Sequence, residues 1–370
     1  MKKVIFIINS LRGGGAEKVV ALIIKYLDRK EFEPVLILFQ KKGSRLKDIE
    51  DMVRIYDLKK RMPVLSFMKL VIKTWFIIKK EKPDIVVSFM GAANLVALIN
   101  KKILKSKIKV IAGIRNLVLI KLKYQRFFLL RYYIHKYLFP ASDLVLTNSF
   151  AAKEEVEELL NVPGKKIQVI GNPLEIDEIR KLSELPLEHK WYNEDVPVII
   201  SAGKLTRAKG FEYLITAFAR IIRDFKCRLI ILGDGKLKSS LAGLIDELNI
   251  KDHVDLPGFR SNPYNYMARS DVFVLSSLWE GLPNVLLEAM ACEIPVITTE
   301  YSRSVHEIIE DEVNGLVVKP GDADLLAQAI LRLLKSKELK EKFIRENKRK
   351  IERFNAEDIV KEYEDLIVNV

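Results

Sequence analysis

Short apolar runs alternate with longer amphipathic stretches through the first half of the chain. KVIFIIN, at residues 3–9, is followed by AEKVVALIIKYL, PVLILF, FMKLVIKTWFIIKK and DIVVSFM. Short continuous apolar runs are typical of strands buried on both faces, and apolar residues three and four apart predict helices. The alternation therefore predicts parallel strands joined by helical crossovers, in an α/β sheet covered on both faces.

The same rhythm resumes after residue 195, with VPVIISAG, GFEYLITAFARII, CRLIILGDG, LKSSLAGLIDELN, HVDLPGF, DVFVLSS and PVITT. Between the two halves, residues 171–197 are polar and acidic and contain three prolines, as is typical of a linker. We therefore expect two doubly wound domains facing a cleft, over residues 1–185 and 190–352. A last helix, at about 355–370, is expected to pack back on the first domain.

The composition indicates the broad class of the protein and its cellular compartment. A length of 370 residues, with 49% hydrophobic and 30% charged residues, describes a soluble globular protein of two domains. The apolar run before Asn9 is too short for a signal-peptide core, and no run is long enough to span a bilayer. Cys227 and Cys292 lie alone in apolar segments, so neither a disulfide nor a metal site is expected. We expect a cytoplasmic protein.

The positive charge is concentrated in the first half. Residues 1–190 hold 37 Lys and Arg against 20 Asp and Glu, whereas the remainder holds 25 against 29. Residues 85–142 contain eleven basic residues and no acidic one. Such one-sided charge indicates a polyanionic partner, either a membrane or a nucleic acid.

Ligands of open parallel sheets bind where strands end and loops lead into helices, and four such junctions stand out. The first is NSLRGGGAEKVV, in which glycines let the backbone approach a ligand closely. Lys18 stands where the dinucleotide fingerprint needs its last glycine, so that motif fails. This junction is either a binding loop or a structural turn.

The second junction, SAGKLTRAKGFEYL, places Lys204, Arg207 and Lys209 within six residues of one another. Cations beside a helix N-terminus suit a diphosphate, although solvated surface lysines are the plain alternative. The third junction, IILGDG with Gly233, is weak by itself because such turns often only connect elements.

The fourth junction, WEGLPNVLLEAM, carries Glu280 and Glu288. Pro283 suits a first helical turn, and N–H groups near Asn284 and Val285 could then face a phosphate. Glu288 lies among apolar residues, where an acid is costly to bury unless it is hydrogen-bonded, and sugar hydroxyls would be natural partners. The plain alternative is a first-turn glutamate that favours the helix dipole.

These stretches carry a resemblance. GKLTRAKG, ILGDG, EGLPNVLLEAMACEIPVITT and NGLVVKPGDADLLAQAI resemble the C-terminal half of family 4 glycosyltransferases, and INSLRGGGAEKVV is similar to their N-terminal glycine loop. The similarity is strong over 195–330 and loose over 20–150. It implies a retaining enzyme with the GT-B fold, which has two Rossmann-like domains. The glutamate pair with seven residues between is the family's most specific mark.

The resemblance implies roles for matching residues. Glu280 would contact hydroxyls of the transferred sugar, and Glu288 would contact the nucleotide ribose. Lys204 and Lys209 would neutralise the diphosphate leaving group, so Glu280, Lys209 and Lys204 form the expected catalytic set.

The remaining implied contacts are with the donor. Gly14 and Gly15 would approach it from the other domain, and Gly258–Arg260 would lie near the base. The expected donor-binding residues are Gly14, Gly15, Lys204, Arg207, Lys209, Gly233, Arg260, Glu280, Gly281, Leu282, Pro283, Asn284, Val285 and Glu288.

Metals, cofactors and histidines are not expected to contribute. If lysines neutralise the diphosphate, no metal is needed, and Asp322 and Asp324 are better explained as a helix cap. No cofactor is expected, because the nucleotide-sugar is a substrate. We expect this sugar to be linked to UDP. Many family members carry a histidine after the strand that matches DIVVSF, but here Met90 and Gly91 follow.

The basic half carries candidates for an acceptor and membrane site. Residues 117–139 form a basic, aromatic-rich amphipathic pattern that suits an anionic membrane, or else a core helix with a solvated face. Nucleic acid is not expected, since no recognised binding module is present. The acceptor and membrane candidates are Arg115, Asn116, Lys121, Lys123, Arg126 and Arg131.

The sequence thus predicts a metal-independent, retaining glycosyltransferase, peripheral on the inner face of the cell membrane. It would move a hexose or N-acetylhexosamine to a polyprenyl-diphosphate-linked saccharide or a glycolipid, in cell-surface glycan assembly. Two alternatives remain open. One is a sugar-nucleotide epimerase on the same fold, and the other is a basic membrane-binding adaptor without activity.

Overall fold

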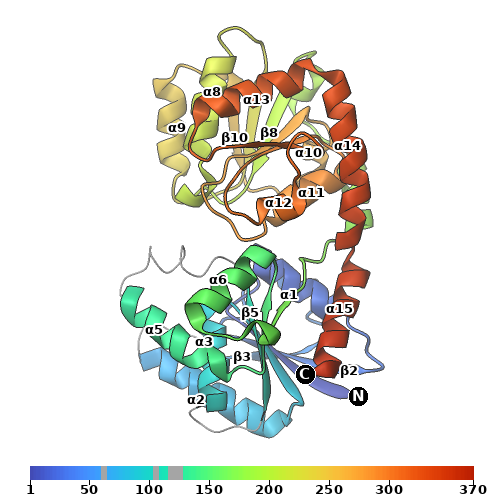
Figure 1. Ribbon diagram of the computed structural model, residues 1–370. Coiled ribbons are helices and arrows are strands. Elements are labelled where there is room, and N and C mark those ends of the chain that lie inside the picture. The colour runs from blue at the N-terminus through green and yellow to red at the C-terminus, as the bar shows by residue number, and fades with distance from the viewer. Residues whose placement is uncertain (60–64, 103–107, 116–127) are drawn as a thin grey trace. The chain divides into compact units, whose positions relative to one another are not determined.

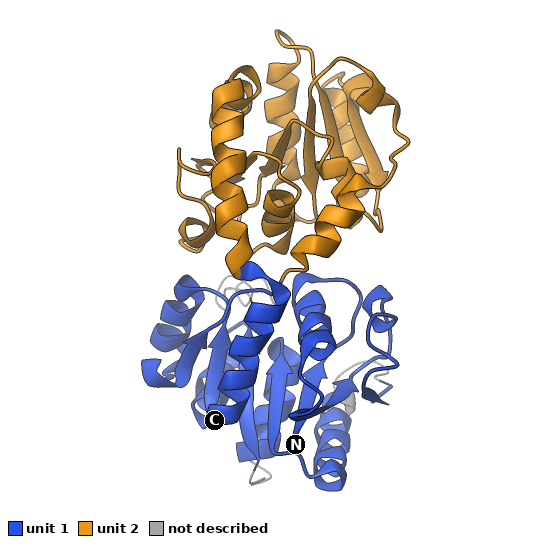
Figure 2. Cartoon of the chain, turned by 90° about the vertical axis from the view of Figure 1, so that its right-hand side faces the viewer, with its two compact units in different colours: residues 1–173, 354–370 blue, residues 174–353 orange. Residues whose placement is uncertain are grey.

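The computed structural model describes residues 1–59, 65–102, 108–115 and 128–370. The chain forms two compact units (Figures 1 and 2). The first comprises Met1–Pro173 with Phe354–Val370, and the second comprises Leu174–Arg353. Each unit is built on its own parallel sheet, which confirms the α/β prediction.

The first unit has a seven-stranded sheet with the order β3-β2-β1-β4-β5-β6-β7, in which every described pairing is parallel. Its strands are β1 (Lys2–Ile8), β2 (Phe32–Leu38), β3 (Arg54–Asp57), β4 (Ile85–Phe89), β5 (Lys109–Ile114), β6 (Leu144–Thr147) and β7 (Ile167–Val169). Because the middle strands are covered on both faces, β1 from Val4 onward and all of β4 are buried.

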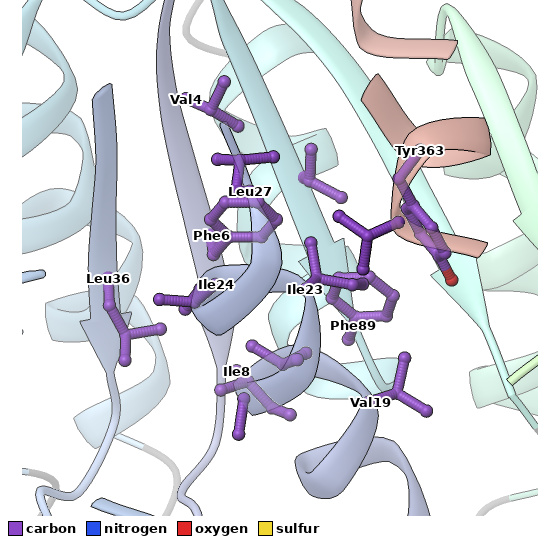
Figure 3. Close-up of a cluster of buried hydrophobic side chains, with 14 of the residues drawn as sticks. Val4, Phe6, Ile8, Val19, Ile23, Ile24, Leu27, Leu36, Phe89 and Tyr363 are labelled. Atoms are coloured by element: carbon purple, nitrogen blue, oxygen red, sulfur yellow. The ribbon is translucent and has the colours of Figure 1, made fainter. Parts of the chain in front are cut away.

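Helices cover both faces of this sheet. They are α1 (Gly15–Tyr26), α2 (Leu65–Glu81), α3 (Gly91–Lys102), α5 (Phe128–Leu138), α6 (Phe150–Leu160) and α15 (Ala356–Asn369). The first and last of these pack on one face, against alternate strand residues such as Phe6 and Phe89 (Figure 3). The other four pack on the opposite face, against residues such as Ile5 and Val86.

The last helix of the chain, α15, belongs to the first unit. Ile359, Val360, Tyr363 and Ile367 are buried there with residues of α1 (Figure 3). Lys2 Nζ donates a 2.8 Å hydrogen bond to the carbonyl oxygen of Val368. The chain end therefore returns to the first unit, as the sequence predicted.

The second unit has a six-stranded parallel sheet with the order β10-β9-β8-β11-β12-β13. Its strands are β8 (Val198–Ala202), β9 (Arg228–Leu232), β10 (Val254–Gly258), β11 (Val272–Leu275), β12 (Val296–Thr299) and β13 (Leu316–Val318). Its helices are α7 (Ile176–Glu184), α8 (Phe211–Ile221), α9 (Lys238–Glu247), α10 (Tyr264–Met267), α11 (Asn284–Ala291), α12 (Val305–Ile308), α13 (Ala323–Lys335) and α14 (Lys337–Ile351).

Both faces of this sheet are also covered. Ile199, Val274 and Ile297 pack with apolar residues of α8, α9 and α13. The intervening residues Ile200 and Phe273 are fully buried as well. Such double coverage is the doubly wound architecture that the alternating pattern predicted.

The division between the units differs from the predicted one. The first unit ends at Pro173, whereas residue 185 was expected, because α7 packs against α10 and α11 of the second unit. The polar composition of residues 171–197 predicted a linker, but the structure has the amphipathic helix IDEIRKLSE within it. Among the described helices, none has the length and apolar character needed to cross a membrane.

Replacing Ile359 by Ala should lower the free energy of unfolding of the first unit by about 2–5 kcal/mol, since the truncation leaves a cavity between α15 and its neighbours. Hydrogen exchange of α1 and α15 amides under increasing urea measures this loss. Val368 lies on the same helix but is 47% exposed, so Val368→Ala is the matched control and should change little. Equal protection in the two variants would contradict the assigned packing of α15.

Candidate active site

Most of the predicted donor-binding residues follow β8 or β11 of the second sheet, at its topological switch point. In the order β10-β9-β8-β11-β12-β13, the chain builds outward in one direction from β8 and in the other from β11. Open parallel sheets bind ligands beyond the carboxyl ends of the strands at such a point. The loop with Lys204 and Lys209 follows β8, and the loop with Glu280 follows β11.

The loop after β8 is fixed by its neighbours. It contains a 3-10 turn, Arg207–Lys209, and then Gly210 in the left-handed region at φ +57°. Ser276 Oγ donates to the carbonyl oxygen of Lys209 over 2.9 Å, and Leu278 N donates to that of Ala208 over 2.8 Å. The loops after β8 and β11 are therefore joined by hydrogen bonds on the two sides of the switch point.

Glu280 and Lys209 meet across these two loops. Lys209 Nζ lies 2.5 Å from Glu280 Oε1, and the side chains are only 15% and 17% exposed. Ser277 Oγ donates to the same carboxylate oxygen over 3.1 Å. The ion pair thus fixes a cation and an anion in half-buried positions. A ligand bound at the switch point would lie beside them. Lys204 and Arg207, on the same loop as Lys209, are exposed.

Thr299, at the end of β12, and Ser304, in the segment after it, hold the Glu280 turn, and neither was predicted as a site residue. Thr299 Oγ1 donates to the carbonyl oxygen of Ser277, and Ser304 Oγ donates to that of Gly281 over 2.5 Å. Tyr301 is buried beside them, and burial together with the nearby Glu280 charge raises the pKa of its phenol. The only sequence signal was the position of EYSRS directly after a strand.

Glu288 lies on the second turn of α11, half-buried, between Leu287 and Ala289, which are fully buried. Pro283 is the N-cap residue of α11, and Asn284 and Val285 form its first turn. The first N–H groups of a helix have no partner within the helix and favour negative charge. Gly281 and Leu282, which complete the turn between the glutamates, are buried.

Gly233 allows the loop after β9 to touch the loop after β8. Its backbone has φ +136°, and a Cβ there would meet the carbonyl oxygen of Gly203 at 1.9 Å. Leu205 N donates to the Asp234 carbonyl oxygen over 3.0 Å, so the two loops are bound together. Arg260, two residues beyond β10, is exposed, and its Nε donates to the Tyr266 hydroxyl over 3.2 Å.

In the first unit, Gly14 and Gly15 are exposed at the carboxyl end of β1, where α1 begins. The loop is held by Glu17, which sequence reasoning missed. One carboxylate oxygen of Glu17 accepts from Gly14 N over 2.8 Å, and the other accepts from Ser10 Oγ over 3.0 Å. The glycine loop is therefore a fixed turn.

The predicted acceptor residues differ from one another in exposure. Arg115, directly after β5, is buried and donates from Nη1 to Ile170 O over 3.3 Å and to Asn172 Oδ1 over 3.1 Å. Arg131 on α5 is exposed. Four further candidates lie outside the described residues: Asn116, Lys121, Lys123 and Arg126.

Large apolar side chains are exposed along α2 and α5. Both helices pack against α3, on the same face of the first sheet. The exposed residues, which we call the α2–α5 face, are Met68, Ile72, Phe76, Leu129, Leu130, Tyr133 and Tyr137, each at least 47% exposed. Exposed basic residues of the same helices lie among them, Lys69, Lys73 and Arg131 included.

The remaining predictions concern caps, histidines and metals. Asp322 caps α13 by accepting from Asp324 N and Leu325 N, so the cap prediction is confirmed. His135 is buried on α5, stacks on Phe139, and brings Nε2 to within 3.7 Å of a Cβ built on Gly91. Within the described ranges, no cluster of acidic, histidine and cysteine side chains could hold a metal ion.

Two family models match the chain, one in each half. The model described as Glycosyltransferase Family 4 matches residues 13–178, and the one described as Glycosyl transferases group 1 matches residues 188–350. Together they cover the second sheet and every strand of the first sheet except β1.

Curated relatives match over nearly the full length. The chain is 30% identical, over 98% of each chain, to the Campylobacter jejuni N-acetylgalactosamine-N,N'-diacetylbacillosaminyl-diphospho-undecaprenol 4-alpha-N-acetylgalactosaminyltransferase. It is 26% identical to the Staphylococcus aureus capsular polysaccharide biosynthesis glycosyltransferase CapM, over 93% of this chain and 91% of that one.

Solved structures share the fold at lower identity. Anabaena HepE in complex with UDP-glucose matches with a TM-score of 0.83 at 21% identity, over the whole of both chains. The lipopolysaccharide outer core galactosyltransferase WaaB matches with a TM-score of 0.74 at 21% identity, over 99% of each chain. The predicted fold of two Rossmann-like domains, GT-B, is confirmed.

Replacing Gly233 by Ala should lower the free energy of unfolding of the second unit by more than about 1 kcal/mol, because the new Cβ meets a backbone oxygen at positive φ. Urea denaturation measures the change. Gly243, on α9, has nothing within 4 Å of a built Cβ, so Gly243→Ala is the matched control and should stabilise by about 0.5–1 kcal/mol. If both variants were stabilised, the close approach of the two loops would be disproved.

Proposed function

The chain belongs to the family 4 glycosyltransferases, and on that premise we propose that it transfers a sugar from UDP to a lipid-linked glycan with retention at the anomeric carbon. The observation that carries the proposal is the Lys209–Glu280 pair at the switch point of the second sheet. An adaptor would have no use for this arrangement.

The diphosphate of the donor would bind between the loop after β8 and the start of α11. Lys204 and Lys209 supply positive side chains there, and the first turn of α11 supplies N–H groups at the positive end of a helix dipole. Negative charge grows on the diphosphate as the bond to the sugar breaks. Fixed donors aimed at that charge stabilise the transition state more than the ground state. Lysines and helix N–H groups can do this without a metal ion.

The two glutamates would bind hydroxyl groups on either side of the diphosphate. Glu280 keeps its second carboxylate oxygen, Oε2, beside the pair that Oε1 makes with Lys209 and Ser277, and it would accept from hydroxyls of the transferred sugar. Glu288, on the second turn of α11, would accept from the ribose. The turn between them fixes their separation, which sets the length of ligand that fits both.

The nature of the nucleotide and the acceptor is drawn from similar proteins. HepE, which shares the fold, is solved in complex with UDP-glucose. The Campylobacter relative is named for adding N-acetylgalactosamine to a diphospho-undecaprenol-linked saccharide, and the Staphylococcus relative for capsular polysaccharide biosynthesis. We therefore propose an acceptor of the polyprenyl-diphosphate-linked class, used at the inner face of the cell membrane.

The α2–α5 face is suited to a membrane that carries such an acceptor. Exposed apolar patches rimmed by polar groups mark interaction sites, and basic residues among them favour an anionic surface. Arg131 and Lys136 on α5 supply cations beside Tyr133 and Tyr137. The predicted basic helix of residues 117–139 includes α5, which begins at Phe128.

Replacing Lys209 by Ala should lower kcat by about 10²–10³, since one fixed donor to the leaving diphosphate is lost. Glu280→Gln should also lose activity, because the amide neither pairs with Lys209 nor accepts as strongly. The measurement is release of UDP from a panel of UDP-sugars, with and without an extracted polyprenyl-linked glycan, in the presence of a metal chelator. Lys251→Ala, at a side chain that is 80% exposed in the same unit, is the charge-matched control and should keep full activity.

Release that requires both one UDP-sugar and the lipid-linked glycan would establish transfer. Release without any acceptor would instead favour the epimerase or a hydrolase. Loss of release on chelation would contradict the metal-independent mechanism, and full activity of Lys209→Ala would contradict the assigned role of this lysine.

The double variant Arg131→Glu/Lys136→Glu should bind phosphatidylglycerol vesicles tenfold or more weakly in sedimentation, because each cation near an anionic surface contributes about 1 kcal/mol. Lys30 and Lys47 are exposed in the loop before β2 and in the segment before β3, outside α2 and α5, so Lys30→Glu/Lys47→Glu carries the same change in net charge. Equal loss in both variants would show that net charge, not the α2–α5 face, determines binding.

A further inference from the structure

Arg115 is a buried cation that has no acidic partner among the described residues. Its side chain follows β5 at the carboxyl edge of the first sheet and is 6% exposed. Nη1 donates to Ile170 O and Asn172 Oδ1, but Nε and Nη2 have no hydrogen-bond partner among the described residues. Burial lowers the pKa of Arg115 to about 9, so the guanidinium stays protonated at neutral pH.

Asn148 brings two more unpartnered polar atoms to the same edge. It directly follows β6, which pairs with β5 in the register Ile114↔Thr147, so Asn148 and Arg115 occupy the next matched positions. Leu146 and Phe89 share one core cluster, and by the alternation of the strands Arg115 and Asn148 point to that face. Asn148 is 3% exposed, and neither Oδ1 nor Nδ2 has a partner within the part of the chain that the structure describes.

A third polar group belongs to α15. The Tyr363 ring lies 5.5 Å from the Arg115 guanidinium carbon, and the Phe89 ring lies 5.3 Å from it. Tyr363 and Phe89 belong to the same core cluster (Figure 3). Tyr363 is 1% exposed, and its hydroxyl is likewise without a partner in the described ranges. Two aromatic rings therefore lie near the Arg115 guanidinium. Arg115, Asn148 and Tyr363 each carry a donor that is unused within the described residues.

A purely structural role explains only part of this arrangement. Nη1 ties Arg115 to the segment after β7, and the rings of Phe89 and Tyr363 favour a cation. Neither accounts for Nε, Nη2, the Asn148 amide and the Tyr363 hydroxyl. A buried charge without a counter-ion is costly, and well-packed apolar residues would hold the same segments together at least as firmly. The unused donors call for an oxyanion, which a guanidinium and an amide bind well.

We propose that Arg115, Asn148 and Tyr363 form an oxyanion site of the first unit, which takes a phosphate group of the acceptor substrate. This inference rests on the proposed function for the source of the phosphate, but not for the binding itself. Arg115 would donate from Nε and Nη2, Asn148 from Nδ2 and Tyr363 from its hydroxyl. The site is distinct from the lysines of the second unit, since all three residues belong to the first unit.

Calorimetric titration with inorganic pyrophosphate tests the site without any donor or acceptor. The full-length variant Lys204→Ala/Lys209→Ala serves as the parent, which removes the lysines expected to bind a diphosphate in the second unit. The parent should bind pyrophosphate. Adding Arg115→Gln should weaken that binding about tenfold or more, because hydrogen bonds from a charged group are lost. Adding Tyr363→Phe removes one oxygen and should weaken it several-fold.

A further variant, Asn148→Asp, distinguishes loss of the site from loss of the fold. It keeps the size of the side chain and supplies an internal carboxylate beside Arg115, which should abolish pyrophosphate binding while raising the unfolding temperature. Arg29→Gln removes a cation of the same unit whose Nη2 donates only to a backbone oxygen, and it should leave binding unchanged. Glucuronate, titrated in parallel, supplies a carboxylate in place of a phosphate.

Pyrophosphate binding that is equal in the parent, Arg115→Gln and Asn148→Asp, or absent from the parent, would overturn the site. Binding of glucuronate but not of pyrophosphate would overturn the phosphate assignment. If no UDP-sugar supports transfer while pyrophosphate binding still depends on Arg115, the proposed function fails and this site stands. If transfer occurs, Arg115→Gln should raise the KM for the lipid-linked acceptor and leave that for the UDP-sugar unchanged.

Discussion

The contact between Lys209 and Glu280 requires two loops from neighbouring strands to be held in a single arrangement. β8 and β11 pair in parallel, and their following loops are tied by Ser276 Oγ and Leu278 N to the carbonyl oxygens of residues 209 and 208. Gly210 permits this approach, because a Cβ there would meet the Ser276 carbonyl oxygen at 2.3 Å. Since the loops are fixed by backbone contacts, the charges they carry are positioned before any ligand arrives, which is the condition for electrostatic stabilisation of a transition state.

The carboxyl edge of the first sheet is built differently, and it suits another kind of ligand. Its glycine loop is fastened by Glu17, and its buried polar groups, Arg115 among them, are partly unpaired. Cations dominate this unit, and the α2–α5 face adds exposed apolar area. An enzyme that transfers a sugar from a soluble nucleotide-sugar to a lipid-linked glycan needs two kinds of surface. One unit carries the paired cation and anion for the donor, and the other carries the basic and apolar side chains that suit an anionic membrane.

The sequence predicted what depends on local pattern and missed what depends on packing. Apolar periodicity was sufficient for two doubly wound sheets, and EGLPNVLLE was sufficient to locate Glu280, because its turn and helix start are encoded within nine residues. Helix α7 was missed because its polar face dominates the composition of 171–197, and only its contacts with α10 and α11 assign it to the second unit. Thr299 and Ser304 act on backbone atoms more than twenty residues away, which no spacing reveals. The contact of Glu17 with Gly14 N spans only three residues, and this spacing was a local signal that was overlooked. The buried state of Arg115 follows from a helix more than two hundred residues away.

A crystal structure of the protein with UDP bound would show the donor site itself. We expect the diphosphate against Lys209 and the first turn of α11, with the ribose hydroxyls on Glu288. Density for UDP at another edge of either sheet, or a diphosphate without contact to Lys209, would contradict the claim that the switch point of the second sheet is the donor site.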